Sequence, residues 1–245
     1  MRTVIGIMPR SYYDKEFERN YLYVYENVRK MILDMGGIPL IITPSVNTDM
    51  YDTKFNEFPE ENDLDFLVNN FYLNNIDGLF LPGGFKYTKF DLDFIDEAIN
   101  KNIPILGVCL GAQSLSNYKK EYSLKPIESD VEHKSPLHTK YSHSVKIEKN
   151  TMLYDIIGKY EIMVNSFHRM QMTSNPLFKN AAFAEDGVLE AIEMKNKDFV
   201  VGVQWHPEVM YEYDLNSKKL LSYFIDKCKS YNSSKSKVVK LWNMI

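Results

Sequence analysis

Short apolar runs alternate along this chain with longer segments of helical periodicity, and this alternation limits the possible folds more than any other feature. Val4–Met8, Ile38–Thr43 and Ile103–Val108 are apolar runs of strand length. The third is almost continuously apolar, as is typical of strands that are covered on both faces. Between the first two, apolar residues recur at helical spacing from Tyr21 to Met35. The alternation predicts an α/β fold with a mostly parallel central sheet between layers of helices.

Further segments complete the expected layout. Gly78–Leu81 is predicted as a strand, and Asp91–Asn102 and Leu215–Cys228 are predicted as helices. The acidic stretch Glu57–Asp65 fits either the start of a helix, where negative charge suits the dipole, or a solvated loop. Five later runs are short and strand-like: Val145–Ile147, Ile162–Val164, Ala181–Ala184, Val188–Glu193 and Phe199–Val203.

One domain is expected over residues 1–228, followed by a polar, basic tail over residues 229–245. A length of 245 residues fits either one large or two small domains. No internal repeat and no linker divides the chain, which favours a single domain. The segment from Lys229 to Lys240 is rich in Lys and Ser and contains no acidic residue, so partial disorder is expected there.

Composition argues against several classes of partner. The chain has 29 Lys and Arg against 33 Asp and Glu, a formal net charge of −4, and thus no general basic surface for nucleic acid. No apolar run approaches the roughly 20 residues of a membrane span, and the first ten residues do not form a signal peptide. Two cysteines are too few for a disulfide framework. We therefore expect a cytoplasmic protein with no membrane or nucleic-acid partner.

The sharpest chemical feature is a cysteine between two glycines, Gly107-Val-Cys-Leu-Gly111, placed after an apolar strand and before a helical segment. This is the pattern of a nucleophile elbow, a tight turn in which a Cβ on either glycine would collide with neighbouring chain. The following helix N-terminus favours the thiolate form of Cys109, which is the reactive form. The alternative is an inert cysteine buried at a strand end.

A thiol nucleophile needs a base, and Gln204-Trp-His-Pro-Glu208 supplies one after the last apolar strand. In an extended chain, residues two apart lie on the same side, so Glu208 is expected to orient His206 while the other ring nitrogen faces Cys109. The chain order Cys, His, Glu differs from the order in α/β-hydrolases. Alone, the motif fits an ordinary surface turn; the cysteine elbow favours the catalytic interpretation.

A third part of the predicted site is an oxyanion hole. Gly83 and Gly84 follow a predicted parallel strand at its carboxyl end, where ligands bind in open α/β sheets. Backbone N–H groups at such a position can approach a developing negative oxygen. The N–H groups of Gly84 and Leu110 are therefore assigned to this hole, with a plain turn as the alternative.

The remaining histidines carry less information. His133, His138 and His143 are five residues apart, which does not place them on one helical face, and no cysteine or acidic pair completes a metal-binding set. We therefore expect no metal site. His168 either lines the pocket or packs within a loop.

Five motifs in this order resemble those of the class I glutamine amidotransferase-like superfamily, and most closely its γ-glutamyl-γ-aminobutyrate hydrolase family. The resemblance covers about residues 3–226 and rests on Leu81–Gly84, Gly107–Gln113, Val164–His168, Asp186–Glu193 and Gly202–Glu208. It implies a flavodoxin-like three-layer fold and a triad of Cys109, His206 and Glu208. Such a triad hydrolyses γ-glutamyl amide bonds through a thioester. The resemblance implies no cofactor and no metal.

The same resemblance implies substrate-binding roles for Gln113, Ser166 and His168. Three segments depart from the family pattern around the pocket, so the resemblance does not identify the substrate: Phe85–Asp91, Tyr118–Leu124 and Arg169–Met170.

Three functions follow from these residues. The first is hydrolysis of a small γ-glutamyl amide resembling γ-glutamyl-γ-aminobutyrate. The second is a glutaminase subunit that supplies ammonia to a separate synthase, and the third is a silent binding protein. A filled triad argues against the third. If the chain assembles, a homodimer is the expected state, because it is the commonest assembly.

Overall fold

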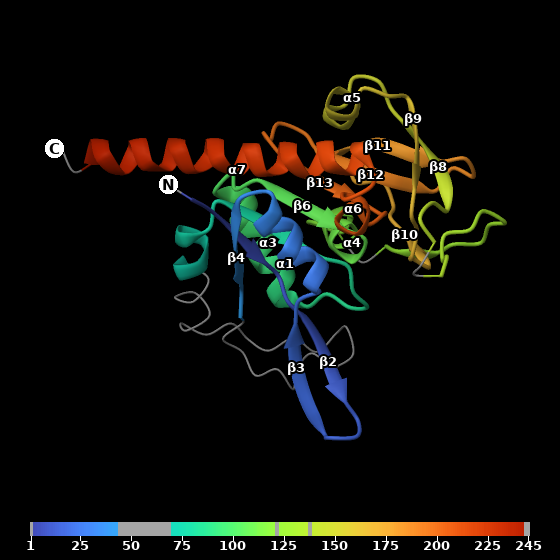
Figure 1. Cartoon of the computed structure of the whole chain (residues 1–245), viewed down its shortest axis with the longest axis horizontal. Helices are drawn as coiled ribbons and strands as arrows, with labels where there is room; N and C mark the ends of the chain where they lie inside the picture. The colour runs from blue at the N-terminus through green and yellow to red at the C-terminus, as the bar shows by residue number, and fades with distance from the viewer. Residues whose placement is uncertain (1, 44–69, 121–122, 137–138, 243–245) are drawn as a thin grey trace.

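Nine strands of the described chain form one sheet, and helices pack on both of its faces (Figure 1). The computed structural model describes residues 2–43, 70–120, 123–136 and 139–242. The strand order is β4-β1-β5-β6-β13-β12-β11-β8-β9. This arrangement confirms the predicted flavodoxin-like, three-layer α/β fold. The segment Glu57–Asp65 lies outside the described residues.

The first half of the sheet is parallel, and its strands are short and mostly buried. Pairing is parallel from β4 through β1, β5 and β6 to β13. The five strands are β1 (Thr3–Ile7), β4 (Gly37–Ile41), β5 (Gly78–Leu81), β6 (Ile105–Val108) and β13 (Val200–Val203).

The second half of the sheet is antiparallel throughout, from β13 outward. Its strands are β8 (His143–Ile147), β9 (Glu161–Val164), β11 (Phe178–Ala184) and β12 (Leu189–Met194). Two small ribbons lie apart from the sheet. They are β7 (Lys125–Pro126) with β10 (Met170–Gln171), and β2 (Arg10–Asp14) with β3 (Arg19–Tyr23).

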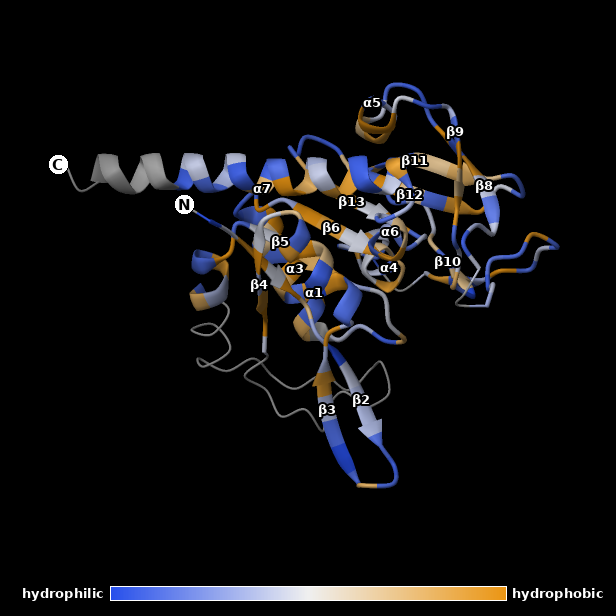
Figure 2. Cartoon of the chain, viewed as in Figure 1, coloured by the Kyte–Doolittle hydropathy of each residue, from blue (hydrophilic) through white to orange (hydrophobic). Residues whose placement is uncertain are grey.

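Each face of the sheet has its own apolar core. One core includes residues of α1 (Glu26–Asp34), α5 (Met152–Ile157), α6 (Pro207–Met210) and α7 (Leu215–Trp242). The other includes residues of α3 (Lys89–Asn100) and α4 (Leu110–Ser116). Figure 2 shows hydrophobic residues along β6 and in stripes along α7. Two covered faces explain why the parallel strands are apolar runs rather than alternating ones.

The predicted helix over Tyr21–Met35 is wrong in its first part. Residues Arg19–Tyr23 pair with Arg10–Asp14 as a hairpin, and the helix starts only at Glu26. The hairpin projects from the body of the protein (Figure 1). Aromatic residues that fit helical spacing also fit a two-stranded ribbon, and here the strand pairing determined the outcome.

The expected disorder after residue 228 is also wrong, because α7 continues to Trp242. The ring of Tyr231 packs against the core that contains α3, and its hydroxyl donates to the carbonyl of Lys101 at 3.3 Å. Asn232 donates to Asp77, and the ammonium group of Lys235 donates to the carbonyl of Ile76. Tertiary contacts thus hold a helix that composition alone does not predict.

Cys228 lies on the buried side of α7 and is fully shielded from solvent. A Cβ added at Gly78 would lie 2.1 Å from its sulfur, so the thiol fills the space that this glycine leaves. Burial raises the pKa of the Cys228 thiol well above its usual value.

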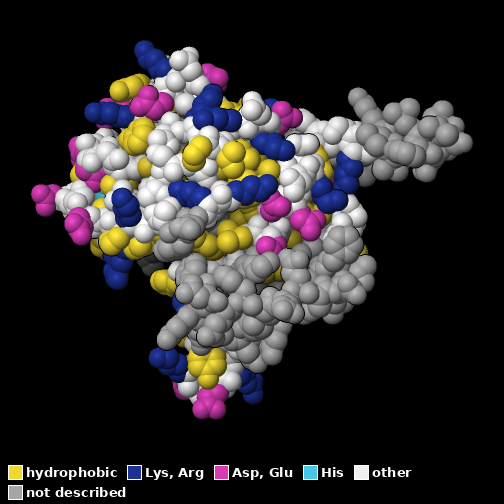
Figure 3. All heavy atoms as spheres, turned by 180° about the vertical axis from the view of Figure 1, so that it is seen from behind, with side chains coloured by type: hydrophobic (Ala, Val, Ile, Leu, Met, Phe, Trp, Pro, Cys, Tyr) yellow, Lys and Arg dark blue, Asp and Glu magenta, His cyan; other side chains and the backbone are white. Residues whose placement is uncertain are grey.

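On the described part of the rear surface, Lys, Arg, Asp and Glu side chains are interspersed among hydrophobic ones, with no large field of one sign (Figure 3). This mixture agrees with the small net charge of the sequence. Among the described helices, none combines the length and apolar character needed to cross a membrane.

Candidate active site

Cys109 stands between the end of β6 and the start of α4, in a backbone conformation that L-residues rarely adopt. Its φ and ψ are 51° and −105°. The turn depends on the two glycines: a Cβ at Gly107 would lie 2.7 Å from the backbone of Gly111, and one at Gly111 would lie 2.1 Å from the carbonyl oxygen of Leu81. Backbone strain of this kind persists only where the surrounding structure enforces it, and such residues cluster at active sites. The local geometry is that of the predicted elbow.

His206 and Glu208 meet on the neighbouring strand end. The Nδ1 of His206 lies 2.7 Å from Oε1 of Glu208. The predicted contact is therefore present, but its backbone cause differs, since a short helix begins at Pro207 and the chain is not extended there. This contact leaves the Nε2 of His206 available to the reacting groups, and it makes no hydrogen bond within the described residues.

Gly83 lies between the histidine and the cysteine. A Cβ at Gly83 would lie 2.7 Å from Cε1 of His206 and 3.5 Å from Cβ of Cys109. The parallel strands β5, β6 and β13 therefore bring all three predicted parts of the site to one edge, as their carboxyl ends must meet there.

The pKa of His206 is raised from 6.5 to about 10. Burial works in the opposite direction, but it is outweighed by the charge of Glu208 and by the interaction with the side chain of Cys109. The protonated imidazole is thus stabilised by the Glu208 carboxylate on one side and by the Cys109 side chain on the other. An oriented histidine beside a cysteine is the arrangement that activates a thiol nucleophile.

Asn165 holds the backbone of His206 and was not singled out from the sequence. Its Oδ1 accepts from the N–H of His206 at 2.8 Å, and its Nδ2 donates to the carbonyl of His206 at 3.1 Å. The side chain is completely buried. Its place within the Val164–His168 motif is the signal that could have identified this residue.

Arg10 supports the glycine loop and was also missed. It is buried, and its guanidinium donates to the carbonyls of Pro82, at 2.6 Å, and Gly83, at 3.2 Å. In a trans peptide the N–H points away from the C=O, so this contact turns the N–H of Gly84 away from the guanidinium. Arg10 thereby fixes the orientation of one predicted oxyanion donor.

The second predicted donor is the N–H of Leu110. Leu110 is the first residue of α4, where a backbone N–H has no acceptor within the helix. A leucine methyl group lies near Gly84: a Cβ there would be 3.1 Å from Cδ2 of Leu110. The two residues are therefore neighbours, and their role as an oxyanion hole stays a prediction.

Asp91 holds Arg10 from the other side. Its Oδ1 accepts from Nη1 of Arg10 at 2.8 Å, in an ion pair that is almost fully buried. The same carboxylate forms a capping box with Thr88 at the start of α3. The cap and the glycine loop thus share one acidic side chain.

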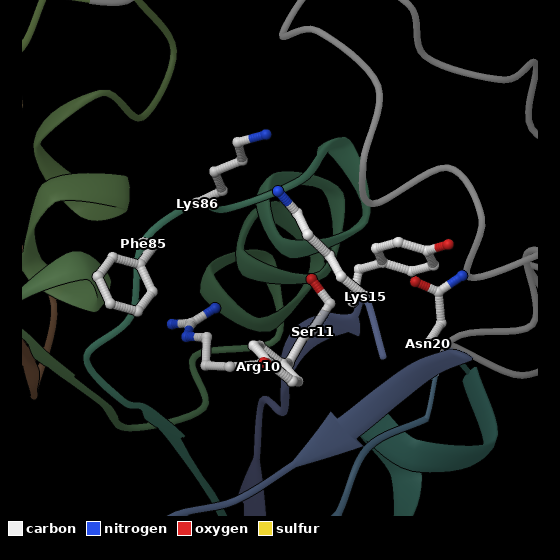
Figure 4. Close-up of a pocket in the computed structure, with 8 residues that line it drawn as sticks. Arg10, Ser11, Lys15, Asn20, Phe85 and Lys86 are labelled. Atoms are coloured by element: carbon white, nitrogen blue, oxygen red, sulfur yellow. The ribbon is translucent and has the colours of Figure 1, made fainter. Parts of the chain in front are cut away.

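A pocket opens beside this loop, between the β2–β3 hairpin and the segment after β5 (Figure 4). Its lining includes Arg10, Tyr12, Lys15, Phe85 and Lys86. Lys15 comes from the hairpin and Lys86 from the segment after β5, so positive charge reaches the pocket from two elements. Such a pocket attracts anionic groups.

The side chains predicted to bind substrate are engaged inside the protein. Nε2 of Gln113 donates to the carbonyl of Met170 at 3.0 Å, and Oγ of Ser166 donates to the carbonyl of His133 at 2.8 Å. His168 is buried beside Glu190. Their substrate-binding roles stay predictions.

The structure also brings together a set of residues that the sequence did not. His133, His143 and His168 surround Glu190 in the antiparallel half of the sheet. The spacing argument considered one helical face, whereas these residues come from two strands and two non-helical segments. His138 lies outside the described residues.

This chain is similar in sequence to a family of cysteine hydrolases and glutamine amidotransferases. The Peptidase C26 pattern matches residues 86–208. The γ-glutamyl-γ-aminobutyrate hydrolase PuuD of Escherichia coli is 28% identical over 68% of this chain and 77% of its own length. A CTP synthase of Helicobacter hepaticus is 29% identical over 82% of this chain but only 43% of its own length.

A solved structure supports the fold. The glutaminase domain of the CTP synthase from Trypanosoma brucei superposes with a TM-score of 0.59, covering 96% of this chain and 94% of that one, at 17% identity.

Proposed function

The chain belongs to the Peptidase C26 family, and from that premise we propose that it hydrolyses the γ-glutamyl amide bond of a small molecule through a cysteine thioester. The observation that carries this proposal is the strained backbone of Cys109 beside the His206–Glu208 pair. A cysteine held at a strand-to-helix turn, with an oriented histidine nearby, is the arrangement that nucleophilic acyl transfer requires.

In the proposed reaction, the thiolate of Cys109 attacks the γ-carbonyl carbon and forms a tetrahedral oxyanion. The N–H groups of Gly84 and Leu110 stabilise this oxyanion. The imidazolium of His206 then donates its Nε2 proton to the leaving amine, and the C–N bond breaks to give a thioester. Water attacks the thioester, His206 takes its proton, and glutamate leaves as the Cys109 sulfur departs. Glu208 keeps the imidazole ring oriented through both steps.

The pocket lined by Lys15 and Lys86 supports an anionic substrate. A γ-glutamyl amide of an amino acid carries carboxylates on both sides of the scissile bond, and the ammonium groups suit one of them. This pocket adjoins Arg10, which contacts the glycine loop. We therefore place the leaving-amine portion of the substrate toward the hairpin, and an acidic leaving amine such as γ-aminobutyrate fits that placement.

The test is product release from glutamine, γ-glutamyl-γ-aminobutyrate, other γ-glutamyl amines and poly-γ-glutamate. We expect one γ-glutamyl amine to be cleaved well, and Cys109→Ala to keep the fold while losing turnover. Cys228→Ala is the matched control, because this thiol is buried far along α7, and it should stay active. Full activity in Cys109→Ala contradicts the proposal.

The second candidate is a glutaminase that delivers ammonia to a separate synthase. The match to less than half of a CTP synthase favours it, since this chain corresponds to a part of that longer protein. It predicts slow cleavage of every free substrate, although Cys109 is alkylated readily, and strong stimulation by a partner. Rapid turnover by the purified chain alone argues for the hydrolase.

The proposed setting is cytoplasmic, in keeping with two unpaired cysteines, one of which must stay reduced to react.

A further inference from the structure

Four buried side chains converge at a point that the proposed reaction does not use. His133, His143, His168 and Glu190 each direct one potential ligand atom to this point, and these atoms all lie within 4.8 Å of one another. All four residues are at most 4% exposed. We call them the His₃Glu cluster.

The inner atoms of the cluster have no hydrogen bonds within the described residues. These atoms are Nδ1 of His133, Nε2 of His143, Nε2 of His168 and both carboxylate oxygens of Glu190. A buried carboxylate without hydrogen bonds is costly unless positive charge accompanies it. The cluster therefore requires positive charge at its centre, either from a bound cation or from protons on the histidines.

The outer ring nitrogens show where the imidazole hydrogens lie. Each of them faces an acceptor: the His133 nitrogen faces Asp186 at 3.0 Å, the His143 nitrogen faces the carbonyl of Ser144 at 3.1 Å, and the His168 nitrogen faces the carbonyl of Met170 at 3.1 Å. A neutral imidazole that donates from its outer nitrogen has a lone pair on its inner one. Three lone pairs then point toward one carboxylate, an arrangement that a bound cation stabilises.

The distances fit a metal better than hydrogen bonds. Oε1 of Glu190 lies 3.3 Å from the inner nitrogens of His133 and His168 and 3.7 Å from that of His143. Hydrogen bonds to a carboxylate are about 2.7–2.9 Å. Four ligands placed tetrahedrally about 2.0–2.1 Å from a zinc ion are separated by about 3.3 Å.

From this geometry we propose that the His₃Glu cluster binds a divalent transition-metal ion, with zinc as the best match. Three imidazoles and one carboxylate suit zinc, and four protein ligands make a closed, structural site rather than a catalytic one with an open position. The outer contacts supply the orienting partners that metal-bound histidines usually have.

The four ligands come from separate parts of the chain, which indicates what the ion does. His143 begins β8, Glu190 lies in β12, and His133 and His168 belong to the non-helical segments before β8 and after β9. The segments of His133 and His168 also bond to each other, through the N–H of His168 and the carbonyl of His133 at 2.9 Å. The ion fastens both segments to the antiparallel half of the sheet.

The first measurement is the metal content of the full chain, purified without a histidine tag and without chelators. We expect about one zinc ion per chain. The ion is then removed with a chelator, and Zn²⁺ is added back while thermal unfolding is followed. Unfolding should shift to lower temperature on removal and return on addition. Co²⁺ in place of Zn²⁺ should give the strong visible absorption of a four-coordinate ion.

Variants locate the site. Glu190→Gln and His168→Gln should lose the ion, and Asp186→Asn, which alters an outer partner, should weaken binding roughly 10–100-fold. His206→Gln and Cys109→Ser are matched controls, because they remove the ligand atoms of the active site and should keep full metal content. For these two controls the measured quantity is metal content, because both substitutions are expected to abolish turnover.

Two outcomes overturn the proposal. One is wild-type protein that carries no metal and whose unfolding does not respond to added Zn²⁺, which leaves a proton-bonded cluster. The other is metal that disappears with Cys109→Ser or His206→Gln, which places the ion at the catalytic thiol. If Glu190→Gln does not fold, the proposal is still tested by the shift in thermal unfolding that added Zn²⁺ causes in metal-free wild-type protein and in Asp186→Asn.

Discussion

The two halves of the sheet carry two different clusters of reactive side chains. In the parallel half, Cys109, His206 and Glu208 stand at strand ends, with a strained turn and a neighbouring pocket. In the antiparallel half, the His₃Glu cluster is enclosed, and its members come from four segments. The first arrangement leaves a group free to react, whereas the second has every ligand position filled by protein.

The difference between the two clusters follows from the topology of the sheet. Carboxyl ends of parallel strands lie together at one edge and open to solvent, which suits chemistry on a ligand. Antiparallel strands place residues from distant segments side by side in the interior, which suits a site that holds those segments together. Changes to the reacting side chains of the first half should therefore affect rate, and changes to the His₃Glu cluster should affect stability.

The largest effect is expected at the base. His206→Ala should reduce kcat/KM by about 10⁴-fold or more, and Glu208→Gln by less, because triad members act as a unit of unequal weights. Both variants should stay folded at room temperature and keep their metal content. Steady-state kinetics with the best γ-glutamyl substrate measures the ratio. Negligible effects of both substitutions contradict the triad.

The next effect concerns the turn itself. Gly111→Ala places a methyl group 2.1 Å from the carbonyl oxygen of Leu81, which is backbone and cannot move aside. We expect a loss of about 3 kcal/mol or more in the free energy of unfolding. Gly187→Ala is the control: it has positive φ but open space, and should cost only about 1 kcal/mol. Urea unfolding of both variants gives the comparison, and equal losses are the contrary result.

A smaller effect should follow from substituting Arg10, which supports the glycine loop. Arg10→Lys keeps the charge but cannot donate to Pro82, Gly83 and Asp91 together. A misplaced Gly84 N–H should lower kcat by about 10²-fold, with KM changing less. Arg29→Lys, in an exposed pair with Glu26, is the control and should leave kcat unchanged. A change in KM alone shows that Arg10 acts on binding instead.

The smallest effect concerns pH. Because the folded pKa of His206 is raised to about 10, protonated His206 stabilises the fold fully below its unfolded pKa of 6.5. This stabilisation is lost as pH rises toward 10. The stability advantage of wild type over His206→Gln should therefore shrink between about pH 6 and about pH 10. Urea titrations at both pH values measure it, and a constant difference indicates a neutral imidazole.

The sequence predicted the reactive half better than the enclosed half. Cys109 and its glycines form one local pattern, and His206 and Glu208 are two residues apart, so short-range reasoning located them. Arg10 was missed because its partners lie more than 70 residues later in the chain. Its importance depends on strand pairing that no local pattern displays.

The His₃Glu cluster was missed for a related reason. The spacing of His133, His138 and His143 was judged against a helix, and Glu190 was counted only as part of a strand motif. Pairing of β8, β11 and β12 brings these segments together. The hairpin was assigned wrongly because Tyr21 fits helical and strand patterns alike, and only the pairing with Tyr12 distinguishes them.

The packing of Cys228 against Gly78 has a practical consequence. The chain contains two cysteines, and one of them is sealed inside the protein as a thiol with a raised pKa. Under the proposed function, an alkylating reagent therefore modifies a single site in the folded chain, Cys109. The number of labels added per chain then equals the fraction of chains with a reactive Cys109, so any preparation can be titrated directly and its kcat expressed per reactive site.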